Sequence, residues 1–352
     1  MEQWLSTKSI FAVTTTSAVS HPLLTTNRVV EQFDYAVIDE AGQLTEPQVL
    51  GALRKAAKFV LVGDAQQLPP LVVSKEAEQR GMSLSLFERL STRWRAEAVR
   101  SLTIQYRMSA PILSLSNALI YDGAMSCASD FVSTQKLEFE ATAKWKESTE
   151  SSPKWLRHAM DPERAVVMLN TDRLFVDCDV TKSESMDSEN AKSQSIESTK
   201  SNGGTVNEYE ATLTASITSK MMALGIAAAD IGVMAPYRSQ LKLIRSKFEA
   251  LQQSTTSILL DTIDRFQGSD RKLVMMGFTH SPSDRRLGRI VRDWRRINVA
   301  LTRSKCKLIL IASVKALRSS KTPVLEKLIA LLEGNEWIVD VENIGDLDIG
   351  ID

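Results

Sequence analysis

Two acidic residues directly follow an apolar run near the start of the sequence. The segment FDYAVIDEAGQ, residues 33–43, places Asp39 and Glu40 after Tyr35–Ile38. In parallel α/β sheets, ligands bind outside the carboxyl ends of the strands. Nucleotide hydrolysis uses one carboxylate to hold Mg²⁺ and a second to orient and deprotonate the attacking water. The pair therefore predicts a hydrolytic site, although an acidic pair after a strand can also simply begin a helix.

A second apolar run ends in the same way about twenty residues later. In FVLVGDAQQLPP, residues 59–70, the run is followed by Gly63 and Asp64 and then by an amide pair. Gln67 could hydrogen-bond both a phosphate oxygen and the attacking water. Gly-Asp and Pro-Pro are also turn signals, so each segment read alone is compatible with a plain turn. Two such strand ends in succession favour the site.

Arginine, glutamine and glycine stand beside three further apolar runs. The segments are SLTIQYRM (101–108), LLDTIDRFQGSDRKLVMMGF (259–278) and WRRINVALTRSKCKLILIAS (294–313). Arginine stays charged and binds phosphate in a bidentate manner. Taken singly, Arg107 and Arg303 could each be a surface or salt-bridged arginine. In this order the segments predict arginines that a second domain supplies to a γ-phosphate.

The elements that must position these residues are short apolar runs alternating with helical patterns. Runs of four or five apolar residues are typical of strands buried on both faces, and the alternation favours βαβ units and parallel sheets. We therefore predict an α/β fold with an incomplete first parallel-sheet domain and a more complete second one. The predicted strands are Ile10–Val13, Tyr35–Ile38, Phe59–Val62, Leu102–Ile104, Val166–Leu169, Ile231–Met234, Ile258–Leu260, Leu273–Met276 and Leu308–Ile311.

Length and composition exclude several classes of protein. The 352 residues are 43% hydrophobic and 24% charged, which argues against collagen-like, coiled-coil and wholly disordered chains. Apolar stretches such as Leu308–Ala312 are far shorter than the roughly 20 residues that cross a bilayer, so no membrane partner is expected. No secretory signal is visible. Cys127, Cys178 and Cys306 form no CxxC pair, which argues against a disulfide scaffold or a metal cluster.

The formal charges balance, but they are unevenly distributed. Residues 264–318 contain 14 Lys or Arg and 4 Asp or Glu, whereas residues 333–352 contain 7 acidic residues and no basic one. The basic stretch is either a solvated helix face or a surface that contacts a phosphate backbone. Residues 181–204 are rich in Ser, Lys, Glu and Asn, which predicts a disordered insert.

Six segments in this order resemble motifs II to VI of a superfamily 1 helicase motor. They are DEAGQ, GDAQQLPP, QYRM, APYRSQ, DTIDRFQG and NVALTRSK. Connecting segments such as LVVSKEAEQRGMSLSLFERL and VRDWRRINVALTRSKCKLIL are similar to the eukaryotic DNA replication ATP-dependent helicase/nuclease family. The resemblance implies two RecA-like domains, with ATP in the cleft between them and a single strand across their top.

The resemblance also implies roles for individual residues. Asp39 would coordinate Mg²⁺, Glu40 would be the general base and Gln67 would sense the γ-phosphate. Tyr106 would stack on the base, Arg107 and Arg303 would contact the γ-phosphate, and Asp270 would lie near the ribose. The remaining nucleotide-binding positions are Asp64, Gln267 and Gly268, and the positions along the nucleic-acid track are Thr15, Pro236 and Thr262.

A phosphate-binding loop of the form GxxxxGK[ST] is expected in such a motor. None of the 15 glycines here is followed by lysine. In the family this loop and the nuclease domain, with its iron–sulfur cysteines, precede the first motif seen here. We therefore expect a partial RecA-like domain at 1–97, lacking the phosphate-loop strand. A second domain is expected at 98–340, with the insert at 181–204, and an acidic tail at 341–352. No iron–sulfur cluster is expected.

The expected function is that of the C-terminal part of an ATP-dependent 5′-to-3′ DNA helicase that uses ATP and Mg²⁺. Without the phosphate loop, the isolated chain is expected to show no meaningful ATPase or unwinding activity. The expected partners are single-stranded or flap DNA and a single-strand-binding protein, in the nucleus and also the mitochondrion. Two alternatives remain open from the sequence. One is a non-catalytic nucleic-acid-binding pseudo-motor that uses the basic stretch 264–318, and the other is an RNA helicase of the same superfamily.

Overall fold

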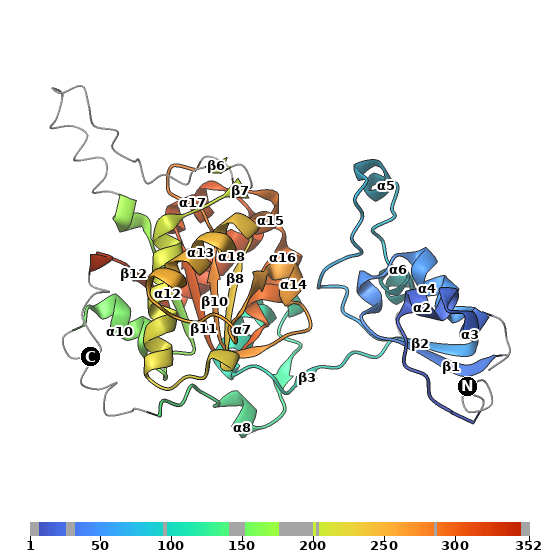
Figure 1. The fold of residues 1–352 in the computed structure, drawn as a ribbon. Coiled ribbons are helices and arrows are strands. Elements are labelled where there is room, and N and C mark those ends of the chain that lie inside the picture. The colour runs from blue at the N-terminus through green and yellow to red at the C-terminus, as the bar shows by residue number, and fades with distance from the viewer. Residues whose placement is uncertain are drawn as a thin grey trace. The chain divides into compact units, whose positions relative to one another are not determined.

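The chain divides into two units, Met1–Ser101 and Leu102–Asp352 (Figure 1). The computed structural model describes residues 7–25, 32–93, 97–140, 152–175, 200–201, 204–284 and 287–345. The N-terminal unit contains the DEAGQ and GDAQQ segments, and the C-terminal unit contains the segments from QYRM onward.

The N-terminal unit is built on two parallel strands joined by a helix. Strand β1 (Phe33–Ile38) pairs with β2 (Ala56–Leu61), with Ile38 opposite Leu61. Helix α4 (Glu46–Leu53) joins them and packs Val49 and Ala52 into a small core with Ile38. The other described helices of this unit are α2 (Thr15–Ser20), α3 (Pro22–Thr25), the 3₁₀ turn Ala41–Gln43, α5 (Lys75–Gln79) and α6 (Leu86–Arg93).

One face of this two-stranded sheet is exposed. Tyr35 and Val37 of β1 and their register partners Lys58 and Val60 are all exposed, whereas Ile38, on the other face, is buried. The predicted strand Ile10–Val13 is wrong. Ile10 is 89% exposed in irregular chain, and the described part of this sheet consists of β1 and β2 only, so no neighbour supplies backbone hydrogen bonds.

The C-terminal unit contains a six-stranded sheet in the order β12-β5-β11-β10-β8-β9. Every neighbouring pair is parallel. The strands are β5 (Val166–Asn170), β8 (Ile231–Ala235), β9 (Leu259–Thr262), β10 (Arg271–Gly277), β11 (Ser304–Ala312) and β12 (Ile338–Asp340). The predicted α/β class with parallel sheets is confirmed, and five of these strands coincide with predicted apolar runs.

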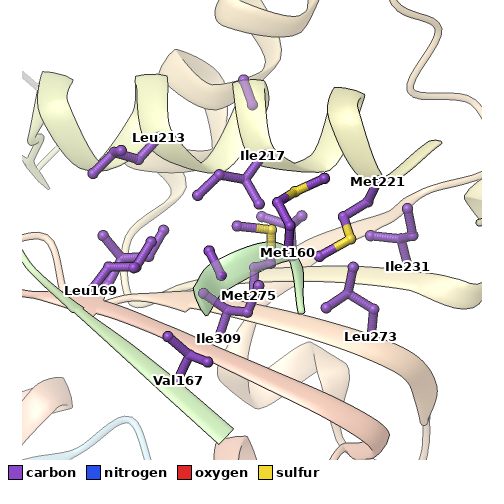
Figure 2. Packing of buried hydrophobic residues seen from close by; sticks show 14 of the residues in the cluster. Met160, Val167, Leu169, Leu213, Ile217, Met221, Ile231, Leu273, Met275 and Ile309 are labelled. Carbon is purple, nitrogen blue, oxygen red and sulfur yellow. The ribbon is translucent and has the colours of Figure 1, made fainter. Parts of the chain in front are cut away.

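Helix α12 (Glu208–Ala223) covers this sheet with a continuous apolar face (Figure 2). Leu213, Ile217 and Met221 recur at helical spacing and are fully buried. In Figure 2 they face the apolar side chains of the strands, among them Val167, Leu169, Leu273, Met275 and Ile309. Because both faces of the central strands are covered, those strands read as unbroken apolar runs.

The remaining described elements connect and flank the six-stranded sheet. Strands β3 (Ile104–Gln105) and β4 (Ser126–Cys127) form a short separate parallel pair, so the predicted strand Leu102–Ile104 is reduced to its end. The helical elements are α7 (Ala110–Ser116), the π-helical Asn117–Tyr121, α8 (Asp130–Ser133), α10 (Lys154–Met160), the 3₁₀ turns Asp172–Phe175 and Ala228–Asp230, α13 (Arg238–Ala250), α14 (Ile263–Phe266), α15 (Arg289–Arg292), α16 (Trp294–Leu301), α17 (Val314–Ser319) and α18 (Pro323–Gly334).

Most of the expected insert and part of the acidic tail lie outside the described residues. Within 181–204, residues 200–201 and 204 are described, and they belong to the antiparallel pair β6 (Lys200–Ser201) and β7 (Gly204–Thr205). In the tail, residues 341–345 are described. Val341 is buried there, and Glu342 pairs with Arg173.

Candidate functional site

The first strand end presents both predicted carboxylates at the carboxyl edge of the sheet. Glu40 adopts a left-handed backbone conformation with φ 50°, and its amide donates to Asp39 Oδ1 at 2.9 Å. The next amide, that of Ala41, donates to the carbonyl of Val62 at 2.8 Å, which ties this turn to the neighbouring strand end. Gln43 Nε2 donates to Glu40 Oε2 at 2.7 Å. Asp39 and Glu40 are both exposed, so their carboxylates are accessible to a ligand.

The second strand end is organised by Asp64. Its Oδ1 accepts the amide of Gln66 at 2.8 Å, and its Oδ2 accepts Gln67 Nε2 at 3.0 Å. Both carboxylate oxygens therefore serve the turn itself. The hydrogen bond from Nε2 orients the side-chain amide of Gln67.

The two turns touch through their backbones. A Cβ atom on Gly63 would lie 3.0 Å from the amide nitrogen of Gly42, and one on Gly42 would lie 3.2 Å from the carbonyl oxygen of Asp64. Only glycine permits so close an approach without displacement of the backbone. The structure therefore brings the predicted residues Asp39, Glu40, Asp64 and Gln67 together on adjacent loops of one sheet edge.

The donor set at this edge suits a hard cation. Among the described residues, no group of three or more His, Cys, Asp or Glu side chains could hold a metal ion by itself. Mg²⁺ rarely needs such a cage, because it usually binds through one or two carboxylates, several waters and the phosphates of a substrate. An exposed Asp39 beside Glu40 fits that mode of binding.

In the C-terminal unit, Arg107 lies in an ionic cluster built from three segments. Its Nε lies 3.2 Å from Asp270 Oδ2, and its Nη1 donates to the carbonyl of Thr302 at 3.3 Å. Lys305 Nζ lies 2.6 Å from the other oxygen, Asp270 Oδ1. Partial burial acts to raise the pKa of Asp270, but the hydrogen bond and charge of Lys305, followed by Arg107, hold that pKa below its usual value.

Arg303 occupies a different environment from Arg107. It is only 2% exposed, with Nε donating to the carbonyl of Val299 at 3.0 Å and Nη2 to Thr302 Oγ1 at 2.9 Å. Thr302 thus contacts both arginines, one through its carbonyl and one through its hydroxyl. The Arg303 side chain is thus buried and held by oxygens of the preceding helix and of Thr302.

The other predicted nucleotide-binding residues of this unit lie close in sequence to members of the cluster. Tyr106, next to Arg107, is 77% exposed and presents its ring at the surface. Gln267 follows α14, and Gly268 adopts φ 79° with open space around its α-carbon, two residues before Asp270. The left-handed conformation explains the glycine, because an L-residue would be strained there.

The predicted nucleic-acid residues fall into two places. Pro236 follows β8 and Thr262 ends β9, and these neighbouring strands run in register with Ala235 opposite Thr262. The two residues therefore share the carboxyl edge of the sheet. Thr15 lies in the N-terminal unit as the first residue of α2, after the N-cap Thr14.

Sequence reasoning missed several residues that connect the motifs. Arg296 binds Asp264 through two nitrogens, at 2.8 and 3.0 Å, and binds Asp293 at 2.6 Å. Gln135 also contacts Arg107 of the QYRM segment, and Lys305 contacts Asp270, which follows the DTIDRFQG segment. The segments WRRINVAL and DTIDRFQG contain arginines and acidic residues that could form ion pairs. The sequence alone does not identify which acidic residue pairs with which arginine.

The basic stretch 264–318 does not form one continuous charged face. Lys307 is fully buried, and its Nζ donates to the carbonyls of Asp161 and Arg164 at 2.7 and 2.6 Å. Burial lowers the pKa of Lys307 to about 7. Lys272 pairs with Asp230 at 2.8 Å. Lys307 is therefore unavailable at the surface, and Lys272 is paired with a carboxylate.

Comparison with known protein families gives matches along nearly the whole chain. One AAA domain profile matches residues 82–315, and a second AAA domain profile matches residues 1–75. The solved structure titled "The structure of PRRSV helicase" superposes over 79% of this chain and 34% of its own, with 12% identity and a TM-score of 0.34.

Curated relatives share substantial sequence identity with the chain. "DNA replication ATP-dependent helicase/nuclease DNA2" of Xenopus laevis is 39% identical over 351 residues, covering 97% of this chain and 30% of the relative. The Homo sapiens protein of that name is 38% identical over 347 residues, covering 96% and 29%. The Saccharomyces cerevisiae protein is 35% identical over 328 residues, covering 92% and 20%.

The chain spans 20 to 30% of the length of these relatives. Its predicted resemblance to the DNA replication ATP-dependent helicase/nucleases is confirmed. Because one profile alone matches well over half of the residues, the chain belongs to the AAA domain family.

Proposed function

We propose that this chain is part of an ATP-dependent DNA helicase motor, the C-terminal part, which couples ATP hydrolysis to 5′-to-3′ translocation along single-stranded DNA. The observation that carries the proposal is the contact between the turns that bear Glu40 and Gln67, through Gly42 and Gly63. A general base and a water-orienting amide on adjacent loops are what phosphoanhydride hydrolysis requires. The similarity to helicase/nucleases supports ATP as the nucleotide.

Each residue of the N-terminal unit has a proposed part in this reaction. Asp39 holds Mg²⁺, which neutralises charge on the phosphates when it is bound. Glu40, whose Oε2 accepts from Gln43, deprotonates the attacking water. Gln67 senses the γ-phosphate. Asp64 orients the side chain of Gln67 by accepting a 3.0 Å hydrogen bond from Gln67 Nε2.

The C-terminal unit supplies the remaining proposed nucleotide contacts. Arg107 and Arg303 bind the γ-phosphate, because guanidinium groups remain charged and bind phosphate oxygens in pairs. Tyr106 stacks on the base, and Asp270, with Gln267 and Gly268 preceding it, lies beside the ribose. The exposed ring of Tyr106 and the exposed part of Arg107 are consistent with these roles.

The proposed DNA partner is a single strand or a flap, contacted along Thr15, Pro236 and Thr262. A single-strand-binding protein is a proposed second partner. The relatives' names place them in DNA replication, so we propose that the chain acts in the nucleus and also in the mitochondrion. We also propose that these 352 residues bind no iron–sulfur cluster. In the described part of the chain, no helix has the length and apolar character needed to cross a membrane.

The test is DNA-stimulated ATP hydrolysis by the longest natural gene product that carries these residues. Glu40→Gln should lower kcat by roughly a hundredfold or more, the range that a positioned general base contributes, while single-strand binding is retained. The matched control is Asp34→Asn, which changes an exposed carboxylate of β1 and should leave kcat unchanged. Unaltered hydrolysis in Glu40→Gln would overturn the proposal.

Two further comparisons separate the alternatives. The 352-residue polypeptide, whose sequence contains no Gly-Lys pair for a phosphate loop, should hydrolyse no ATP alone. Salt-sensitive single-strand binding by the natural gene product, with no effect of nucleotide, would indicate a binding module instead. Stimulation by RNA that exceeds stimulation by DNA would indicate an RNA helicase.

A further inference from the structure

The backbone of the QYRM turn is held by a buried glutamine. Gln105, only 9% exposed, accepts the amides of Arg107 and Met108 through its Oε1, each at 2.7 Å. Its Nε2 donates to the carbonyl of Met108 at 2.8 Å. The Gln105 side chain therefore bridges the backbone of the turn and holds the backbone amide of Arg107.

A second glutamine holds the carbonyl side of Arg107. Gln135 lies just after helix α8, and its Nε2 donates to the carbonyl oxygen of Arg107 at 2.6 Å. Its Oε1 lies 4.0 Å from the thiol of Cys306, which donates to it from strand β11. Gln135 thereby connects Arg107 to the strand that follows Arg303.

The position of this backbone matters because the Arg107 side chain is long and only partly buried. Its guanidinium already contacts Asp270 and the carbonyl of Thr302, at 3.2 and 3.3 Å. These distances are at the long end for hydrogen bonds, so the side chain alone fixes its own position weakly. Productive contact with a phosphate requires placement to within about 0.5 Å, which supporting hydrogen bonds supply.

We infer that Gln135 is a positioning residue for Arg107. By holding the Arg107 carbonyl, it sets the height and direction from which the guanidinium reaches the γ-phosphate of a nucleoside triphosphate. The inference rests on the proposed function, since that function supplies the phosphate that Arg107 binds. Gln135 itself touches no nucleotide in this scheme, so its effect is transmitted through Arg107.

The experiment compares Gln135→Leu and Gln135→Glu with the wild type in the longest natural gene product. Leucine removes the donor, and glutamate keeps the size of the side chain but presents a carboxylate to the Arg107 carbonyl. Loss of one hydrogen bond corresponds to about a fivefold to tenfold change. We expect binding of a non-hydrolysable ATP analogue to weaken and kcat to fall by that factor in both variants. Binding of ADP, which has no γ-phosphate, should not change.

Two controls separate positioning from loss of structure. Thr134→Val changes the neighbouring residue, whose hydroxyl donates to the carbonyl of Asp130 in α8, and it should behave as the wild type. In an Arg107→Ala background, Gln135→Leu should cause no further loss, because the group that it positions is gone. A residue that only supports the fold would weaken ATP and ADP alike and would add its effect to that of Arg107→Ala.

The outcomes distinguish this inference from the proposed function. If Arg107→Ala lowers hydrolysis while both Gln135 variants retain wild-type preference for the triphosphate, the positioning role is wrong and the proposed function stands. The positioning role is also wrong if the losses from Gln135→Leu and Arg107→Ala multiply. If Arg107→Ala hydrolyses ATP as the wild type does, both the role of Arg107 and the inference built on it fail.

Discussion

Arg107 and Asp270 are 163 positions apart in the sequence and form an ion pair with an Nε–Oδ2 distance of 3.2 Å. Lys305, from a third segment, binds the other carboxylate oxygen at 2.6 Å. One carboxylate, two residues after the DTIDRFQG segment, therefore links the QYRM and NVALTRSK segments within the C-terminal unit. The ionisation of Asp270 should therefore affect the stability of this unit, which can be measured as a function of pH.

Replacing Asp270 with asparagine should cost stability at neutral pH and little in acid. Burial acts to raise the pKa of Asp270, but Lys305 and Arg107 bring it below the ordinary value of 3.8. A carboxyl with a lowered folded-state pKa contributes stability above the unfolded pKa and loses it as the pH falls through the folded pKa. The pair is partly exposed, so we expect up to about 1 kcal/mol at pH 7.

The measurement for Asp270→Asn is urea unfolding at pH 7 and pH 3. The difference in free energy of unfolding between wild type and variant should shrink at the lower pH. Glu138→Gln, which changes an exposed carboxylate of the same unit, should stay within about 0.5 kcal/mol of the wild type at both pH values. An equal cost of Asp270→Asn at both pH values would contradict the ionic role.

Glu210 should make the protein less stable as the pH rises toward 8. Its carboxylate is fully buried beneath the turn after β10 and accepts the amide of Thr279 at 2.7 Å. Burial raises its pKa from 4.5 to about 8. Between these values the folded state binds the proton more tightly than the unfolded state, so stability falls as the pH increases.

Glu210→Gln removes this titration and keeps the shape of the side chain. We expect the stability of the wild type, relative to the variant, to decrease between about pH 5 and pH 8, by a few kcal/mol. Chemical denaturation across that range measures the effect. Parallel pH profiles for the two proteins would show that Glu210 does not titrate in this window.

A methyl group at Gly63 should disturb the contact between the two strand-end turns of the N-terminal unit. A Cβ there would lie 3.0 Å from the amide nitrogen of Gly42 and 3.3 Å from that of Ala41. Both neighbours are backbone atoms, so one turn must shift. Gly63→Ala should destabilise the unit by about 1–3 kcal/mol and lower ATP hydrolysis in the natural gene product.

The matched substitution is Gly334→Ala at the end of α18. No atom lies within 4 Å of a Cβ at this position. Alanine favours helix by up to about 1 kcal/mol over glycine, so this variant should be neutral or slightly stabilised. Thermal unfolding of both variants is the measurement, and equal melting temperatures would show that the turns tolerate the shift.

Arg296 and Asp264 should couple more strongly than a fully surface pair. Arg296 is 22% exposed in its side chain and binds both oxygens of Asp264. The comparison pair, Arg318 and Glu333, is 55% and 47% exposed. Double-mutant cycles should give a coupling energy of about 1 kcal/mol or more for the first pair and below about 0.5 kcal/mol for the second. Equal coupling energies would show that the bidentate contact adds nothing.

The sequence by itself determined the class of the fold and the family. Runs such as Val166–Leu169 and Leu308–Ile311 became central strands because both faces of those strands are covered, so every position is apolar. The motifs and their order determined the resemblance to helicase/nucleases. The glycine, acidic and amide residues of each motif are consecutive in the sequence, so they can be recognised without the tertiary structure. The placement of Glu40 and Gln67 on neighbouring loops followed from parallel pairing of β1 and β2.

Only the tertiary structure decided which distant side chains meet. Gln135 gives no sequence signal, because its contact with Arg107 depends on how the segment after α8 returns to the QYRM turn. The burial of Arg303 is similarly invisible, since an arginine can pair with any carbonyl that the fold brings near. Ile10–Val13 has the composition of a strand, yet a strand forms only where a partner offers hydrogen bonds. Local composition can be read from the sequence, whereas contacts between distant residues depend on how the chain packs.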